Sequence, residues 1–228
     1  FYRTHGDDYD FLAFYLASGL NTWLGSPTAL ASAFFIRNNT LGIGLDPFDM
    51  GGSFGSPSRL QTILSMNGLH RYENDPHTPV GPDQFTPLDF LAHEMGHRWL
   101  AYVLVDSAGT PSPALLGRAF QHWNFFFDCE GSVMEGCGWT SPAPDSFRTD
   151  SVTIGFGGLD RYLMGLASAA ETSPFFVVNQ PTDFDPPGNY VPYSVPMVGL
   201  GCRGVATPWT VSDIAAVHGP RVPDAASA

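Results

Sequence analysis

The sequence predicts an α+β protein in which an N-terminal mixed sheet packs on one buried helix and a smaller, loop-rich part follows. Three observations predict this class. Aromatic and aliphatic runs near the N-terminus are typical of strands, a long apolar segment in the middle begins with strong helix-start signals, and short mixed elements come after it. No segment resembles a linker, so residues 1–228 are predicted to form a single domain.

The N-terminal part is predicted to contain two strands, a helix and a loop. Residues 9–16 and 31–37 are rich in aromatic and aliphatic side chains, and the turn signal Asn38-Asn39 follows the second run. Residues 59–69 carry apolar side chains at positions 60, 63, 64 and 66, which is a helical spacing. Residues 73–85 are dense in Pro, Asp, Asn and Gly and predict a loop.

The central helix is predicted to span residues 87–105. Thr86 is a natural N-cap, Pro87 suits the first helical position, and Asp89 lies where it can complete a capping box. The segment is apolar on nearly every side, so we expect the helix to be buried. Beyond it, we expect a hairpin formed by residues 120–128 and 132–135, helices over 158–166 and 211–217, a strand over 175–178 and an acidic loop over 181–188.

Composition excludes some classes of partner. The net charge of −12 argues against nucleic acid and anionic membranes, and no apolar run is long enough to cross a bilayer. All ten basic residues are arginine, and Gly and Pro are abundant, which favours an exported enzyme. Because the chain begins at Phe1 without a leader, we interpret it as a mature or excised fragment of a secreted or extracellular protein.

Three cysteines, Cys129, Cys137 and Cys202, can form at most one bridge. Cys129 and Cys137 flank the predicted hairpin, so a local disulfide is expected there; three unpaired buried thiols are the alternative.

The segment His93-Glu94-Met95-Gly96-His97 has the spacing of a catalytic metal site. Residues i and i+4 share one face of a helix, so the imidazoles of His93 and His97 can bind the same Zn²⁺ ion. Glu94 can then act as general base toward a water molecule that Zn²⁺ has made more acidic. The chemistry predicted is hydrolysis of an amide bond without a covalent intermediate.

The run FLAHEMGHRWLAYV resembles the active-site helix of the zincin metallopeptidases. Together with HWNFFFD, GSVMEG, LDRYLMGL and GPRVP, it is similar to a group of exported bacterial proteins thought to be peptidases. The resemblance implies a zincin-like fold, with an N-terminal sheet, an active-site helix under a cleft and a third ligand from the C-terminal part.

The third ligand departs from the familiar zincin patterns. A metzincin has another histidine where this chain has Val103, and a gluzincin takes a glutamate from a later helix. We predict His122, because a neutral imidazole on an ordered aromatic segment is a favoured zinc ligand. Asp160 and Glu135 remain the alternatives. The other four histidines, His5, His70, His77 and His218, are predicted to lie at the surface.

Further candidates follow from residue type alone. A tyrosine could stabilise the transition state, and acidic pairs could bind Ca²⁺. The tyrosines are Tyr162, Tyr190 and Tyr193, and the pairs are Asp46 with Asp49 and Asp183 with Asp185.

The sequence therefore predicts a zinc endopeptidase that acts on protein or peptide substrates, without indicating its cleavage preference or oligomeric state. Two alternatives stay open: a non-catalytic surface or adhesion domain with a structural metal, and a zinc hydrolase of another amide bond. Retention of Glu94 disfavours the first of these, since a structural ion needs no base.

Overall fold

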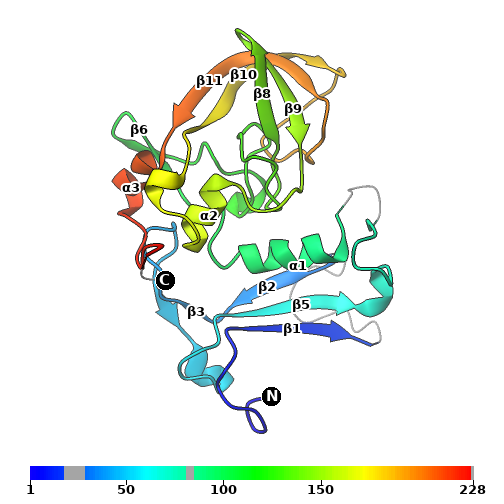
Figure 1. Cartoon of the computed structure of the whole chain (residues 1–228), viewed down its shortest axis with the longest axis vertical. Coiled ribbons are helices and arrows are strands. Elements are labelled where there is room, and N and C mark those ends of the chain that lie inside the picture. The colour runs from blue at the N-terminus through cyan, green and yellow to red at the C-terminus, as the bar shows by residue number, and fades with distance from the viewer. Residues whose placement is uncertain (18–28, 81–84, 227–228) are drawn as a thin grey trace. The chain divides into compact units, whose positions relative to one another are not determined.

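The computed structural model describes residues 1–17, 29–80 and 85–226 (Figure 1). The chain divides into two compact units. Unit 1 comprises Phe1–Asn39 and Asp46–Arg98, and unit 2 comprises Thr40–Leu45 and Trp99–Ala228. The described residues form three α-helices and several sheets, which confirms the α+β class.

Unit 1 is built on a three-stranded sheet with one helix along it (Figure 1). The strand order is β1-β5-β2, with β1 parallel to β5 and β2 antiparallel to it, so the sheet is mixed as predicted. Its elements are β1 (Phe11–Leu16), β2 (Ser32–Phe35), β5 (Thr62–Gly68) and α1 (Pro87–Gly96). A small ribbon of β3 (Arg37–Asn38) and β4 (Phe48–Asp49) and the 3₁₀ turns η1 (Gly51–Phe54) and η2 (Leu69–Arg71) complete the unit.

The central strand β5 corrects the prediction of a helix over residues 59–69. Alternate residues from Thr62 to Gly68 are buried, which is the period of a strand. The apolar positions 60, 64 and 66 fit this period equally well, and two neighbouring strands satisfy the backbone of β5 on both sides. Asn38, predicted to lie in a turn, belongs to β3.

Helix α1 begins as predicted and ends earlier. Asp89 N–H donates to Thr86 Oγ1 at 3.2 Å, and Thr86 N–H donates to the Asp89 carboxylate at 2.8 Å, which is a complete capping box. The helix ends at Gly96, with His97 as its C-cap, and not at Val105. It is also less buried than expected, since Leu88 is 43% exposed.

Arg98 anchors the chain directly after this end. Its side chain is 1% exposed and donates hydrogen bonds within unit 1 to the side-chain oxygens of Gln61 at 2.9 Å, Asn38 at 2.9 Å and Asn39 at 3.2 Å. These bonds fix the chain directly after the last helical turn. Gly96, a poor helix former, sits in that same turn.

We expect Arg98→Ala to lower the free energy of unfolding by about 3 kcal/mol, because it leaves buried amide oxygens without their charged donor. The matched control is Arg59→Ala in the same unit. Arg59 forms an exposed ion pair with Asp10 at 2.8 Å, and its loss should cost less than about 1 kcal/mol. Urea unfolding of both variants measures the difference, and equal destabilisation would contradict the role given to Arg98.

Unit 2 contains an antiparallel sheet and two helices (Figure 1). The strand order is β10-β11-β9-β8. Its elements are β8 (Gly138–Ala143), β9 (Ser146–Ser151), β10 (Phe175–Asp185), β11 (Gly201–Trp209), the ribbon β6 (Val105–Ser107) and β7 (Thr110–Ser112), α2 (Gly158–Met164), α3 (Val211–His218), and the 3₁₀ turns η4 (Arg118–Phe120) and η5 (Ala169–Glu171). An aromatic core, including Trp123, Phe125 and Phe127, fills the unit.

The structure confirms the two short helices of unit 2 and corrects its strands. The predicted hairpin over residues 120–135 is wrong, because this segment makes only isolated bridges such as Leu116 with Trp123 and Asp128 with Cys137. Positive φ angles at Phe120, Glu130 and Glu135 break any regular strand there. Strand β10 continues to Asp185, through most of the loop predicted over 181–188.

The predicted bridge between Cys129 and Cys137 is also wrong, since all three cysteines are free thiols and buried. The Cys129 thiol donates to the carbonyl of Cys137 at 3.3 Å, whereas the Cys137 thiol donates to the carbonyl of Met197 at 3.8 Å. Burial raises the pKa of Cys137 to about 12, so this thiol is unreactive at neutral pH.

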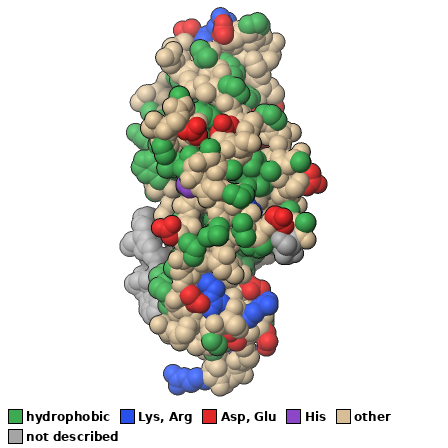
Figure 2. All heavy atoms as spheres, turned by 90° about the vertical axis from the view of Figure 1, so that its left-hand side faces the viewer, with side chains coloured by type: hydrophobic (Ala, Val, Ile, Leu, Met, Phe, Trp, Pro, Cys, Tyr) green, Lys and Arg blue, Asp and Glu red, His purple; other side chains and the backbone are tan. Residues whose placement is uncertain are grey.

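The surface agrees with the acidic composition. On the face seen in Figure 2, acidic side chains are scattered and hydrophobic side chains lie exposed among them. None of the helices in the described part of the chain is long and apolar enough to cross a membrane.

Candidate metal centre

His93 and His97 lie at the C-terminal end of α1, one helical turn apart. Both side chains are only 7% exposed. Their ring centroids are 4.7 Å apart and the rings are nearly perpendicular, at 88°. This is the arrangement expected for residues i and i+4 of a helix, and it brings two imidazoles together in a buried position.

His122 follows the 3₁₀ turn η4 and is 5% exposed. Its Nδ1 lies 2.9 Å from the backbone carbonyl of Arg118, and its Nε2 lies 2.8 Å from Nη2 of Arg118. A carbonyl can only accept and a guanidinium can only donate, so Nδ1 carries the proton and Nε2 presents its lone pair. Burial is the largest effect on His122 and lowers its pKa, which favours the neutral, ligating form.

His93, His97 and His122 are a group of buried histidines, within the described residues, that could hold a metal ion. Each offers one ring nitrogen as a ligand, and His93 and His97 belong to unit 1 whereas His122 belongs to unit 2. Of the three ligands that the sequence proposed, His93 and His97 therefore lie together at the end of one helix. Neutral imidazoles suit Zn²⁺ and also other transition metals, so the donors fit zinc without identifying the ion.

Glu94 lies beside His93 on α1 and is 7% exposed. Its negative charge acts on Tyr72, whose pKa is raised first by burial, then by Tyr15 and Glu94. A carboxylate held in such buried surroundings is typical of a general base rather than of a solvated surface group.

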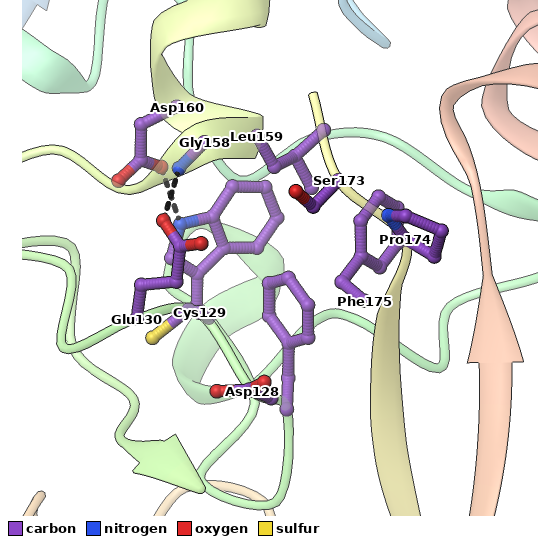
Figure 3. Close-up of a pocket in the computed structure, with 11 residues that line it drawn as sticks. Asp128, Cys129, Glu130, Gly158, Leu159, Asp160, Ser173, Pro174 and Phe175 are labelled. Carbon is purple, nitrogen blue, oxygen red and sulfur yellow. Dashed lines mark hydrogen bonds between the residues drawn. The ribbon is translucent and has the colours of Figure 1, made fainter. Parts of the chain in front are cut away.

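Asp160, an alternative third ligand, has a structural role. Its carboxylate accepts a hydrogen bond from Trp123 Nε1–H at 2.8 Å (Figure 3). It accepts a second from Gly157 N–H at 2.8 Å. It is 1% exposed, and burial raises its pKa to about 6 against the hydrogen bonds from Ser132 and Trp123. The carboxylate caps α2 and anchors the indole that follows His122, and it is not part of the histidine group.

Glu135, the other alternative, is likewise outside the histidine group. Its Oε1 lies 3.7 Å from Nε2 of His122, and its carboxylate forms an ion pair with Arg118. The acidic pairs proposed for Ca²⁺ are not in such a group either. Asp49 is engaged by Arg37 at 2.9 Å and by the N–H of Gly51 at 2.8 Å.

The structure corrects one of the four surface histidines. His5, His70 and His77 are exposed as predicted. His218, at the end of α3, is half-buried, and its Nε2 accepts a hydrogen bond from the N–H of Leu104 at 2.8 Å. Burial lowers the pKa of His218, as suits an imidazole that acts as an acceptor.

The three candidate tyrosines have other partners or lie at the surface. Tyr162 Oη accepts a hydrogen bond from the N–H of Arg221 at 3.1 Å, and Tyr190 stacks on Phe125 with ring centroids 5.9 Å apart. Tyr193 is 65% exposed. Beside His122 the structure places the side chains of Glu135 and of Arg118, and no motif in the sequence marks Arg118.

No protein-family model, curated protein or solved structure matches the chain. The assignment of function therefore depends on the residues themselves.

Proposed function

We propose that this protein is a zinc-dependent endopeptidase that uses His93, His97 and His122 as ligands and Glu94 as general base. The observation that carries the proposal is the end of α1, where the buried imidazoles of His93 and His97 lie one turn apart with the buried carboxylate of Glu94 beside them. The buried imidazole of His122 is the proposed third ligand. Catalytic zinc sites commonly have three protein ligands and keep one position for water or substrate. A structural metal site would instead be closed by a fourth protein ligand and would need no base.

The residues would divide the reaction as follows. A bound Zn²⁺ polarises a carbonyl and makes water more acidic. Glu94 takes the proton of the attacking water and passes it to the leaving amine nitrogen. His122 is held in the tautomer that has its lone pair on Nε2, because its Nδ1–H is bonded to the carbonyl of Arg118.

Hydrolysis of unfolded protein tests the proposal against its two alternatives. Casein or gelatin should be degraded by the zinc-loaded protein, and a chelator should stop the degradation. A protein that binds zinc without hydrolysing any amide would favour the structural-metal alternative. Hydrolysis of glycan or lipid amides, with protein substrates left intact, would favour the third function.

The affinity for zinc should fall as the pH falls. Imidazole must be neutral to bind zinc, so protons compete as the pH falls below about 6.5. The pKa of His122 is lowered by burial, so this residue should lose its ligating form only at still lower pH. We expect little change in zinc affinity from pH 8 to 7 and a loss of at least about tenfold by pH 5.5, measured by chelator competition. An affinity that is constant over this range would contradict histidine ligation.

A further inference from the structure

A small cavity, which we call the α2 pocket, lies within unit 2 between the first turn of α2 and the start of β10. Its volume is about 20 Å³, enough for one group the size of a water molecule. In Figure 3, Glu130 and Asp160 lie on one side of it, and Ser173, Pro174 and Phe175 lie on the other. Ser173 and Pro174 are exposed, so the pocket opens to solvent beside them.

Three buried aromatic rings, those of Trp123, Phe127 and Phe175, form much of the apolar lining of the α2 pocket. The ring centroid of Phe127 is 5.4 Å from that of Trp123 and 5.5 Å from that of Phe175, and both pairs meet nearly edge to face, at 77° and 74°. The face of an aromatic ring attracts a cation that comes within about 6 Å of the ring centroid. The aromatic lining therefore suits a cation and not an anion.

Three carboxylates, those of Asp128, Glu130 and Asp160, add negative charge to the same lining. Within the described residues, none of them forms an ion pair with an arginine or a histidine. Burial is the largest effect on both aspartates and raises the pKa of each, and the charge of Glu130 raises both further. The carboxylates thus repel one another, and a bound cation would relieve this repulsion.

Neutral donors hold these carboxylates in place and leave their charge unchanged. Oε2 of Glu130 accepts a hydrogen bond from the N–H of Gly158 at 2.6 Å, and Asp160 accepts one from the indole N–H of Trp123 at 2.8 Å (Figure 3). The oxygens around the pocket are therefore fixed before any ligand binds, which lowers the entropy lost on binding.

The lining favours an ammonium group over a metal ion or a guanidinium. Ca²⁺ takes about six to eight oxygen ligands. The group of described side chains that could hold a metal ion contains none of these three carboxylates. A guanidinium is planar and broad, whereas an ammonium is compact and has three donors that rotate freely. The small volume of the pocket therefore selects the ammonium.

We propose that the α2 pocket binds a primary ammonium at the end of an alkyl chain, namely the side chain of a lysine in another polypeptide. The flexible four-carbon stem of lysine can reach the buried rings from outside while its apolar part lies along Pro174 at the mouth. This chain contains no lysine, so none of its own side chains can supply the ammonium. The binding requires no amide hydrolysis and is independent of the proposed function.

The test titrates N-acetyl-lysine methylamide into the wild-type protein by isothermal calorimetry. We expect weak but saturable binding. N-acetyl-arginine methylamide should bind at least about tenfold more weakly because its head is too broad, and the uncharged norleucine compound should not bind. n-Butylammonium has the same head and a similar stem, and it should bind no more tightly than the lysine compound.

Glu130→Gln removes one negative charge and keeps the oxygen that accepts from the N–H of Gly158. We expect it to bind the lysine compound about tenfold more weakly, through loss of a charged partner. Asp183→Asn, at an exposed position on β10 of the same unit, is the control and should bind as the wild type does. The unfolding temperature of each variant checks that it is folded, and the comparison of ligands on the wild type needs no variant.

Several results would overturn the proposal. Absence of saturable binding, or equal affinity for the lysine and arginine compounds, would show that the pocket does not select an ammonium. Unchanged affinity in folded Glu130→Gln would place the binding elsewhere. Tighter binding of n-butylammonium would make the ligand a free amine, and displacement of the lysine compound by equimolar K⁺ would make the pocket a site for monovalent ions.

Discussion

Glu94→Gln is expected to keep zinc at full occupancy while turnover falls by at least about 10²-fold. Glutamine preserves the shape and volume of the side chain but cannot take a proton from water. The proposed ligands are the imidazoles of His93, His97 and His122, and none of them is altered by the substitution. Metal content measured by elemental analysis, alongside initial rates on casein, separates the base from the ligands.

Glu73→Gln is the control, since Glu73 is exposed and belongs to unit 1, as Glu94 does. It should show wild-type rates and wild-type zinc content. Near-native turnover in fully metallated Glu94→Gln would exclude Glu94 as the base, even if the three histidines do bind the ion.

His122→Ala is expected to weaken zinc binding by at least the 10–100-fold that loss of even an outer-shell partner typically costs. Two imidazoles on one helix cannot supply the three protein ligands that a catalytic zinc site commonly has. Asp160→Asn should leave zinc affinity within a few-fold of wild type, because Asp160 bonds to Trp123 and Gly157 and not to the histidine group. Chelator competition measures both affinities.

His77→Ala, at an exposed position, controls for the general effect of removing an imidazole. Because Asp160 caps α2 and is 1% exposed, Asp160→Asn should lower the unfolding temperature without lowering metal content. Should Asp160→Asn lose zinc while His122→Ala retains it, the site would belong closer to the zincins with a carboxylate ligand.

Features set by local sequence could be predicted, and features set by distant contacts could not. The start of α1 depends on Thr86, Pro87 and Asp89, which are neighbours in the chain, and its capping box forms as expected. The chain directly after α1 is held by Arg98, which bonds to Asn38 and Gln61, and both are far away in sequence. The sequence predicts a helix where β5 lies, because the apolar positions at 60, 64 and 66 fit the period of a helix as well as that of a strand. The pairing of β5 with two neighbouring strands decides between them.

The same distinction between local sequence and distant contacts applies to the residues of the candidate site. His93, Glu94 and His97 share one short motif whose spacing alone implies a metal. His122 could be proposed from residue type and surroundings, but its tautomer depends on the carbonyl and guanidinium of Arg118. Arg118 itself has no sequence signature, since its relevance comes from lying beside His122 and being held by Glu135.

The anchoring of Arg98 has a consequence for the order of assembly. His97 is the last residue before Arg98, and the oxygens that hold Arg98 come from residues close to β3 and to the start of β5. The turn that carries His93 and His97 therefore acquires its final geometry only once those parts of unit 1 have come together. Zinc capture should be a late event in folding, and the rate at which a refolding chain takes up zinc would report when this part of the protein becomes native.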